Sequence, residues 1–146
     1  MRYRAITLSI IAAWLVGCGG DDNLVASYSI GKDVALRLEL KPIHPFLAEY
    51  ERIAVLQGAD GSTVRQKLAL DTGGYSATNL YQCGPARFML KGYFDNWLID
   101  TAAGTVRSGA CDSPVYIGIF EGKGREPWRF HSSQQRPEKA LIPSGG

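Results

Sequence analysis

The chain contains few of the residues that build most catalytic and metal sites. Its 146 residues include only two histidines, His44 and His131, and three cysteines. Nothing in the sequence places the histidines together or beside a pair of carboxylates, whereas a metal site needs several convergent ligands. We therefore expect no metal site, no cofactor and no enzymatic activity.

The sequence also lacks a charge excess of either sign outside its first residues. Arg2 and Arg4 account for the whole formal net charge of +2. The rest of the chain has 14 basic and 14 acidic residues, so its formal net charge is zero. No basic run or basic helical stripe exists. Because proteins that bind nucleic acid present such a basic footprint, we exclude that class of partner.

No apolar run is long enough to span a membrane. The longest one, residues 5–16, is broken by Thr7 and Ser9, whereas a spanning helix needs about 20 apolar residues. Its length and the preceding Arg2 and Arg4 are typical of a secretory signal peptide, in which a short cationic segment precedes an apolar helix. We expect residues 1–17 to be this signal peptide.

The quartet Leu-Val-Gly-Cys at 15–18 ends the apolar run and resembles the lipobox of bacterial lipoproteins. The resemblance implies that Cys18 receives a diacylglyceryl thioether and becomes the first residue after cleavage. Two or three acyl chains anchor a protein stably where a single chain does not. We expect residues 18–23 to be the acylated cysteine and a flexible tether.

Gly19 follows the lipobox cysteine. An Asp at this position would resemble the inner-membrane retention signal of enteric bacteria. The resemblance therefore implies a lipid-anchored protein of the bacterial cell envelope, on the outer membrane and facing the periplasm. It also implies that the membrane itself is a partner, through the N-terminal lipid.

Two cysteines remain, Cys83 and Cys111. In an oxidising compartment, two remaining cysteines most simply form a disulfide. Such a bridge is worth about 3 kcal/mol in the chain-entropy model. A metal-binding pair or a redox pair are the alternatives, although the two residues lack the close spacing of a C-x-x-C motif.

Helical periodicity over three turns is absent after residue 23, and short alternating segments replace it. Residues 33–41 are the clearest, because apolar side chains occupy every second position there. In residues 47–57 the alternation slips near Arg52, which indicates a β-bulge. The strands that we expect lie at 24–30, 33–41, 47–57, 63–71, 77–83, 87–91, 96–100, 105–108, 115–121 and 128–131.

This pattern predicts an all-β fold. Many short strands with turns between them are typical of a small β-sandwich or an antiparallel barrel, here with the strands joined as a meander. We expect one domain at residues 24–131. The polar residues 132–146 contain Pro137 and Pro143 and are expected to form a loosely ordered tail.

One motif resembles a catalytic sequence. Asp71-Thr72-Gly73 follows an apolar strand and resembles the active-site motif of pepsin-like and retroviral aspartic proteases. In those enzymes two such aspartates share a proton. Because the chain has a single copy, the resemblance implies a protease only as a symmetric dimer. The alternative is a strand that enters a β-turn, where Asp and Gly are favoured.

Aromatic residues are numerous, and most aromatics in strands pack in cores. Aromatic side chains near loops are also typical anchors of interfaces. If the domain has a binding surface, we expect it at Tyr93, Phe94, Trp97 and Trp128.

Residues 71–129 resemble small uncharacterised exported proteins of proteobacteria. The motifs that carry this resemblance are Asp71-Thr72-Gly73-Gly74, Asn79-Leu80-Tyr81, Leu98-Ile99-Asp100, Tyr116-Ile117-Gly118 and Trp128-Arg129-Phe130. These proteins have no known biochemical activity that the resemblance could carry over to this chain.

We therefore expect a lipid-anchored envelope protein with a non-catalytic binding or structural role and a partner in the cell envelope. The alternative is a periplasmic inhibitor or immunity protein. An inhibitor presents a protruding rigid loop, because a rigid loop loses little entropy on binding. Residues 42–46 and 121–127 are the candidates for that loop.

Overall fold

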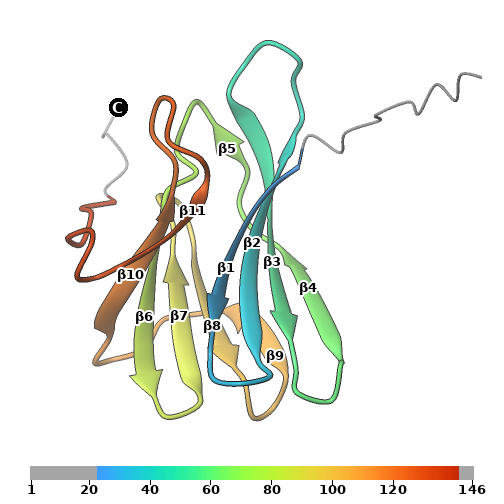
Figure 1. The fold of residues 1–146 in the computed structure, drawn as a ribbon, viewed down its shortest axis with the longest axis vertical. Coiled ribbons are helices and arrows are strands. Elements are labelled where there is room, and N and C mark those ends of the chain that lie inside the picture. Colours follow the sequence, from blue (N-terminus) through green and yellow to red (C-terminus); the bar gives the residue numbers. More distant parts are fainter. Residues whose placement is uncertain (1–22, 142–146) are drawn as a thin grey trace, which may run out of the picture.

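The computed structural model describes residues 23–141, which form two antiparallel β-sheets packed face to face (Figure 1). These residues contain no helix, so none is long and apolar enough to cross a membrane. The all-β prediction is confirmed, and of the two arrangements expected, the sandwich describes it. The signal peptide at 1–17, its helix, Cys18 and most of the tether lie outside the described residues.

The first sheet is a meander in the order β1-β2-β3-β4, and the short β5 also pairs with β3. Along β2, Leu36, Leu38 and Leu40 are buried while the alternate residues are partly exposed. The period of two read from the sequence therefore becomes the inner and outer faces of this sheet. Its strands are β1 (Leu24–Ser29), β2 (Ala35–Pro42), β3 (Glu49–Gln57), β4 (Thr63–Lys67) and β5 (Asp71–Thr72).

The second sheet has the order β11-β10-β6-β7-β8-β9. The meander prediction holds from β6 to β9 and is wrong at the next connection, because β10 crosses over to pair with β6. The connection between β9 and β10 begins with Gly109 and ends with Pro114. It leads from β9 past β8 and β7 to β6 instead of closing a tight hairpin with β9. The strands are β6 (Thr78–Gly84), β7 (Arg87–Lys91), β8 (Asn96–Asp100), β9 (Thr105–Ser108), β10 (Val115–Glu121) and β11 (Arg129–Ser132).

A disulfide joins Cys83 to Cys111, with their Cα atoms 6.1 Å apart. This confirms the pairing predicted from the sequence. Cys83 lies near the end of β6, and Cys111 lies in the crossover between β9 and β10. The disulfide therefore links the crossover to β6, the strand with which β10 pairs.

The hydrophobic core lies between the two sheets, and both contribute inward-facing side chains. Tyr28 and Phe88 pack edge to face across this space, with ring centroids 6.4 Å apart. The buried members of the core are Ala26, Leu36, Leu38, Ala54, Leu56, Leu68, Leu80, Phe88, Leu90, Ile99 and Phe120.

The bulge predicted near Arg52 is not in β3 itself. The register of β3 with its other neighbour does shift by one residue here, from Ile53 opposite Lys67 to Tyr50 opposite Asp71, so the extra residue lies in the segment between β4 and β5. The pairing of β2 with β3 is continuous, with Leu40 opposite Arg52 and no shift of register. Arg52 is only 1% exposed and occupies an inward position of β3, two residues before the buried Ala54. The apparent slip in the sequence arises because a charged residue takes a core position.

Residues 63–71 were expected to form one strand but are divided into β4 and β5. The backbone of Ala69 leaves the ladder, because its N–H donates to the Asp95 carboxylate at 2.7 Å. Its carbonyl accepts a hydrogen bond from the Arg52 guanidinium at 3.2 Å. Side chains thus replace the strand partners of this residue.

The expectation of a loose tail is wrong for residues 132–141. Ser132 belongs to β11, and the following residues return over the outer face of the second sheet. The Asn79 side chain donates to the Lys139 carbonyl at 2.8 Å, and the Tyr81 hydroxyl donates to Glu138 at 2.6 Å. Leu141 is 5% exposed and packs in a second apolar cluster with Ala77 and Ile119. Residues 142–146 lie outside the described part.

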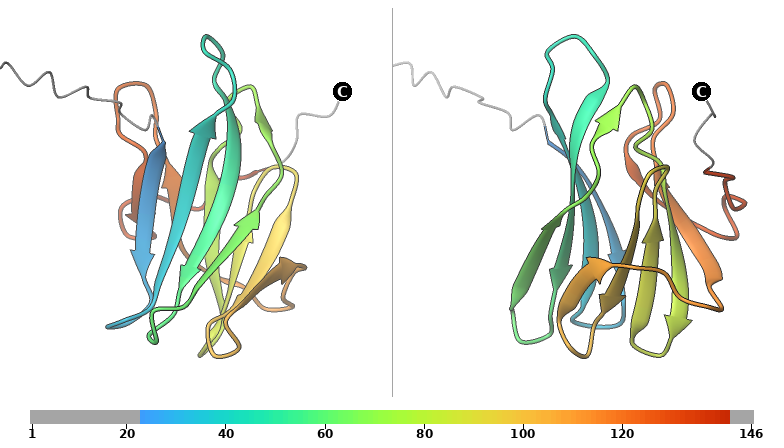
Figure 2. Two further views of the ribbon diagram at one scale, coloured as in Figure 1. Left: turned by 90° about the vertical axis from the view of Figure 1, so that its right-hand side faces the viewer. Right: turned by 180° about the vertical axis from the view of Figure 1, so that it is seen from behind.

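The two ends of the sandwich carry different connections. We call the end where β1 begins the N-terminal pole; the connections 43–48, 73–77 and 122–128 also lie there (Figures 1 and 2). The opposite pole carries the tight turns 30–34, 58–62, 85–86 and 101–104. The first described residues, Asn23 and Leu24, therefore lie at the N-terminal pole.

Candidate functional site

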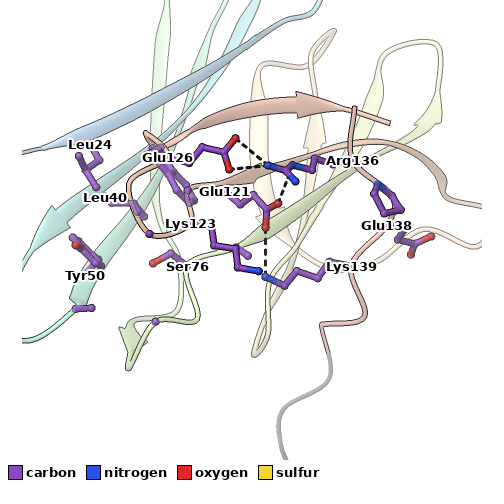
Figure 3. A pocket seen from close by; sticks show the side chains of 17 residues that line it. Leu24, Leu40, Tyr50, Ser76, Glu121, Lys123, Glu126, Arg136, Glu138 and Lys139 are labelled. Atoms are coloured by element: carbon purple, nitrogen blue, oxygen red, sulfur yellow. Dashed lines mark hydrogen bonds and ion pairs between the residues drawn. The ribbon is translucent and has the colours of Figure 1, made fainter. Parts of the chain in front are cut away.

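A cleft of about 700 Å³ opens at the N-terminal pole, between the edges of the two sheets (Figure 3). We call it the end cleft. Leu24, Leu40 and Tyr50 line it from the first sheet. The connection between β10 and β11 and the C-terminal residues 136–139 line the other side.

The wall formed by the second sheet carries charged side chains of both signs. The Arg136 guanidinium binds both carboxylate oxygens of Glu126, at 2.9 and 2.7 Å. The same guanidinium lies 3.7 Å from Glu121, and the Lys139 ammonium lies 3.4 Å from the other oxygen of Glu121. Two carboxylates and two cations therefore form one network, so this wall carries little net charge.

Glu126 stays ionised within this network. Partial burial by itself would raise the pKa of Glu126, but hydrogen bonds and charge from Arg136, with help from Arg129, hold the pKa below its usual range. One nitrogen of the Arg136 guanidinium, Nη2, donates to both oxygens of this carboxylate. The pair thus fixes the C-terminal residues against the connection between β10 and β11.

Trp128 also lines the end cleft. Its indole N–H donates to the carbonyl of Leu38 at 3.1 Å, which joins the second sheet to the first. The ring packs against the core between the sheets. The cleft therefore combines apolar side chains with paired charges, which suits binding of a mixed polar and apolar surface.

The Asp71 side chain forms hydrogen bonds within the turn that follows it. Asp71 is 1% exposed, and its carboxylate accepts hydrogen bonds from the Tyr75 N–H at 2.6 Å and from the Ser76 hydroxyl. Gly73 and Gly74 follow with φ of 117° and 88°, the left-handed region in which glycine is favoured. The carboxylate faces the turn and not solvent, so the geometry gives no support to a dimeric aspartic protease.

The two histidines lie in different environments. His44 lies in the exposed connection between β2 and β3, and its Nδ1 accepts hydrogen bonds from the backbone of Phe46 and Leu47. His131 is 3% exposed in β11, with Nε2 3.8 Å from Glu126. Across residues 23–141, no group of three His, Cys, Asp or Glu side chains converges as metal ligands would.

The four aromatic residues proposed as a binding surface do not form one surface. Tyr93 and Phe94 lie together and pack edge to face on Tyr75, with centroids 4.8 and 5.7 Å away. Trp97 and Trp128 are half-buried and pack against the core. Trp97 donates its indole N–H to Asp95 at 2.8 Å. The aromatic side chains of Tyr93 and the 52% exposed Phe94 remain accessible at the surface.

Sequence reasoning missed most residues of the end cleft. Arg136 and Lys139 lie in the segment expected to be loose, and their carboxylate partners are ten or more residues away in the chain. The available signal was the density of charge in residues 121–139, where acidic and basic residues alternate closely. Spacing of this kind does not show which charges pair.

No family model, no curated protein and no solved structure matches this chain.

Proposed function

We propose that the protein is a lipid-anchored component of the bacterial cell envelope with a non-catalytic binding role, and that the end cleft is its binding site. The observation that carries this proposal is the position of the cleft. It lies at the N-terminal pole, the end of the domain that Cys18 precedes by only a few residues. The binding surface and the proposed anchor thus belong to the same end.

Three features support a binding role in preference to catalysis. Four of the six charged groups that line the cleft are paired with one another, as Glu126 with Arg136 and Glu121 with Lys139 illustrate. The Ser76 hydroxyl donates to Asp71 and has no histidine as its hydrogen-bond partner. Nucleophilic catalysis needs an activating base within hydrogen-bond reach of the hydroxyl. A carboxylate buried in its own turn also cannot act on a substrate.

The anchor is tested by metabolic labelling with an alkyne analogue of palmitate. The wild-type protein should incorporate the label, and Cys18→Ala should lose it because the thiol that forms the thioether is gone. Gly19→Ala keeps a small residue after the cysteine and serves as the matched control. Label retained in Cys18→Ala would refute anchoring at this residue.

The binding site is tested by photo-crosslinking in intact cells. A photoreactive residue at Lys123, which lines the end cleft, should give an adduct of one defined mass. The same residue at Lys67, on the outer face of the first sheet, should give none. Excess unlabelled wild-type protein should compete the Lys123 adduct away; adducts of equal yield from both positions would contradict a site in the cleft.

A further inference from the structure

The connection between β2 and β3 exposes large apolar side chains at the outermost part of the N-terminal pole. We call residues 43–47 the apolar loop. Phe46 is 89% exposed, Leu47 55% and Ile43 46%. Residues 43–48 contain no acidic residue, no lysine and no arginine. The most exposed part of this hairpin therefore consists of groups that water solvates poorly.

Most exposed apolar residues lie at this pole. Of the eight large hydrophobic residues that are exposed among residues 23–141, five lie here on the first sheet, and Phe94 lies at the same pole on the second sheet. The turns of the opposite pole instead carry glycine and small or charged residues, as in 31–33 and 58–62. The five are Leu24, Val25, Ile43, Phe46 and Leu47.

The apolar loop is ordered by its own hydrogen bonds. Nδ1 of His44 accepts the backbone N–H groups of Phe46 and Leu47, each at 3.1 Å. The N–H of Ile43 donates to the carbonyl of Glu49 at 3.1 Å, which closes the base of the loop. Phe46 is thus presented from a fixed backbone, and little entropy remains to be lost when it is buried.

The hairpin extends beyond the start of β1, as Figure 2 shows. Leu24 pairs with Leu40, and the β2–β3 ladder continues outward from there to Pro42 opposite Tyr50. With about 3.3 Å per residue in a strand, the base of the apolar loop lies roughly 7 Å or more past the start of β1. The loop is therefore the part of the pole that any flat surface at this end meets first.

Cys18 precedes Leu24, the first residue of β1, by six residues in the sequence. Six residues span at most roughly 22 Å even when fully extended. A lipid on Cys18 therefore holds the start of β1 within that distance of the membrane surface. Since the apolar loop extends past the start of β1 on the same side, it lies within reach of the lipid headgroups.

We propose that the apolar loop inserts into the membrane interface beside the acyl chains, so that Phe46 and Leu47 form a second, non-covalent contact with lipid. This inference rests on the proposed anchor at Cys18. A lipid surface fits the loop because a row of apolar side chains without charge gains by leaving water at the headgroup boundary. A protein partner that covers the loop instead is an outcome of the test below.

The test is a depth measurement by spin labelling of the full-length, cell-processed protein, purified from membranes and placed in phospholipid vesicles. Phe46→Cys receives a polar nitroxide label, and Ala59→Cys, in the turn at the other end of β3, is the matched control. Cys83 and Cys111 are bonded to each other and do not react. Collision of the label with oxygen, which concentrates in lipid, is compared with collision with a water-soluble nickel chelate.

At position 46 we expect oxygen to relax the label more than the nickel chelate does, and at position 59 we expect the reverse. Equal nickel access at both positions would overturn the inference and leave the loop for a protein partner. Mass analysis of the N-terminal peptide from the same sample shows whether Cys18 is acylated. Failure of the proposed anchor is therefore distinguished from failure of loop insertion.

Discussion

Arg52 is a charged side chain at a core position of β3, and its partners come from both sheets. Its guanidinium lies 3.1 Å from the Asp95 carboxylate and donates to the Thr78 hydroxyl at 2.7 Å. Asp95 in turn accepts hydrogen bonds from Ala69 and Trp97. One buried ion pair therefore ties the middle strand of the first sheet to the strands and connections of the second.

Removing one member of this pair should be costly. Asp95→Ala leaves the Arg52 charge buried without a carboxylate, so we expect the free energy of unfolding to fall by about 3–5 kcal/mol. Urea denaturation of the oxidised protein measures it. Glu39→Ala is the matched control, because it breaks a surface pair with the half-exposed Arg65 and should cost under about 1 kcal/mol. Similar losses in both variants would contradict the role assigned to Asp95.

Tyr81 supplies a pH-dependent contribution. Burial and its hydrogen bond to Glu138 raise the pKa of Tyr81 to about 12, which means that the folded state favours the neutral phenol. Its contribution is fully present below the unfolded pKa of about 10 and is lost as the pH rises to about 12. In urea titrations over this window, wild type should lose more stability than Tyr81→Phe. Parallel losses would show that Tyr81 does not titrate abnormally.

At the scale of elements, the disulfide fixes the one connection that breaks the meander. Cys83 and Cys111 are 28 residues apart in the chain. The double variant Cys83→Ala, Cys111→Ala should lose about 3 kcal/mol of unfolding free energy, because the unfolded chain regains the entropy of an open loop. Wild type measured with a reductant should match the variant. An unfolding midpoint that neither change moves would contradict this account.

The C-terminal segment 133–141 behaves as a strap over the outer face of the second sheet. Leu141→Ala removes the apolar side chain that packs beside Ala77 and Ile119. We expect a loss of about 2 kcal/mol, the lower end for a buried leucine, because the segment lies at the surface. Leu70→Ala, at a 45% exposed position, should lose under about 0.5 kcal/mol in the same urea measurement. Equal effects would mean that the strap contributes nothing.

The elements predicted best are short strands bounded in the sequence by glycine or proline. The strands at 87–91, 96–100, 105–108 and 115–121 have the predicted bounds. Partners are a different matter, because alternation reports which face a residue occupies and not which strand lies beside it. The pairing of β10 with β6 therefore could not be read from the sequence.

The end cleft was hidden for a related reason. Its charged wall depends on contacts such as Arg136 with Glu126, which bring an apparently loose segment back to the domain. Asp71 shows the opposite case, since a motif that resembles a catalytic one is explained by local hydrogen bonds in a turn. The disulfide was predictable because only two cysteines remained after Cys18 was assigned to lipid.

For the whole molecule, the asymmetry of the two poles is the main result. The start of β1, the end cleft and the apolar loop share one end. The opposite end carries short turns of small and charged residues. A lipid at Cys18 would orient the domain, with the end cleft and Phe46 toward the membrane and the tight turns of the opposite pole away from it.

The most direct test of this account is the mass of the N-terminal peptide released from the protein purified from membranes. The account predicts a peptide that begins at Cys18 and carries a diacylglyceryl group on its thiol. A peptide without acyl groups, or a chain cut at another residue, would contradict the anchor and the membrane-facing orientation of the domain together.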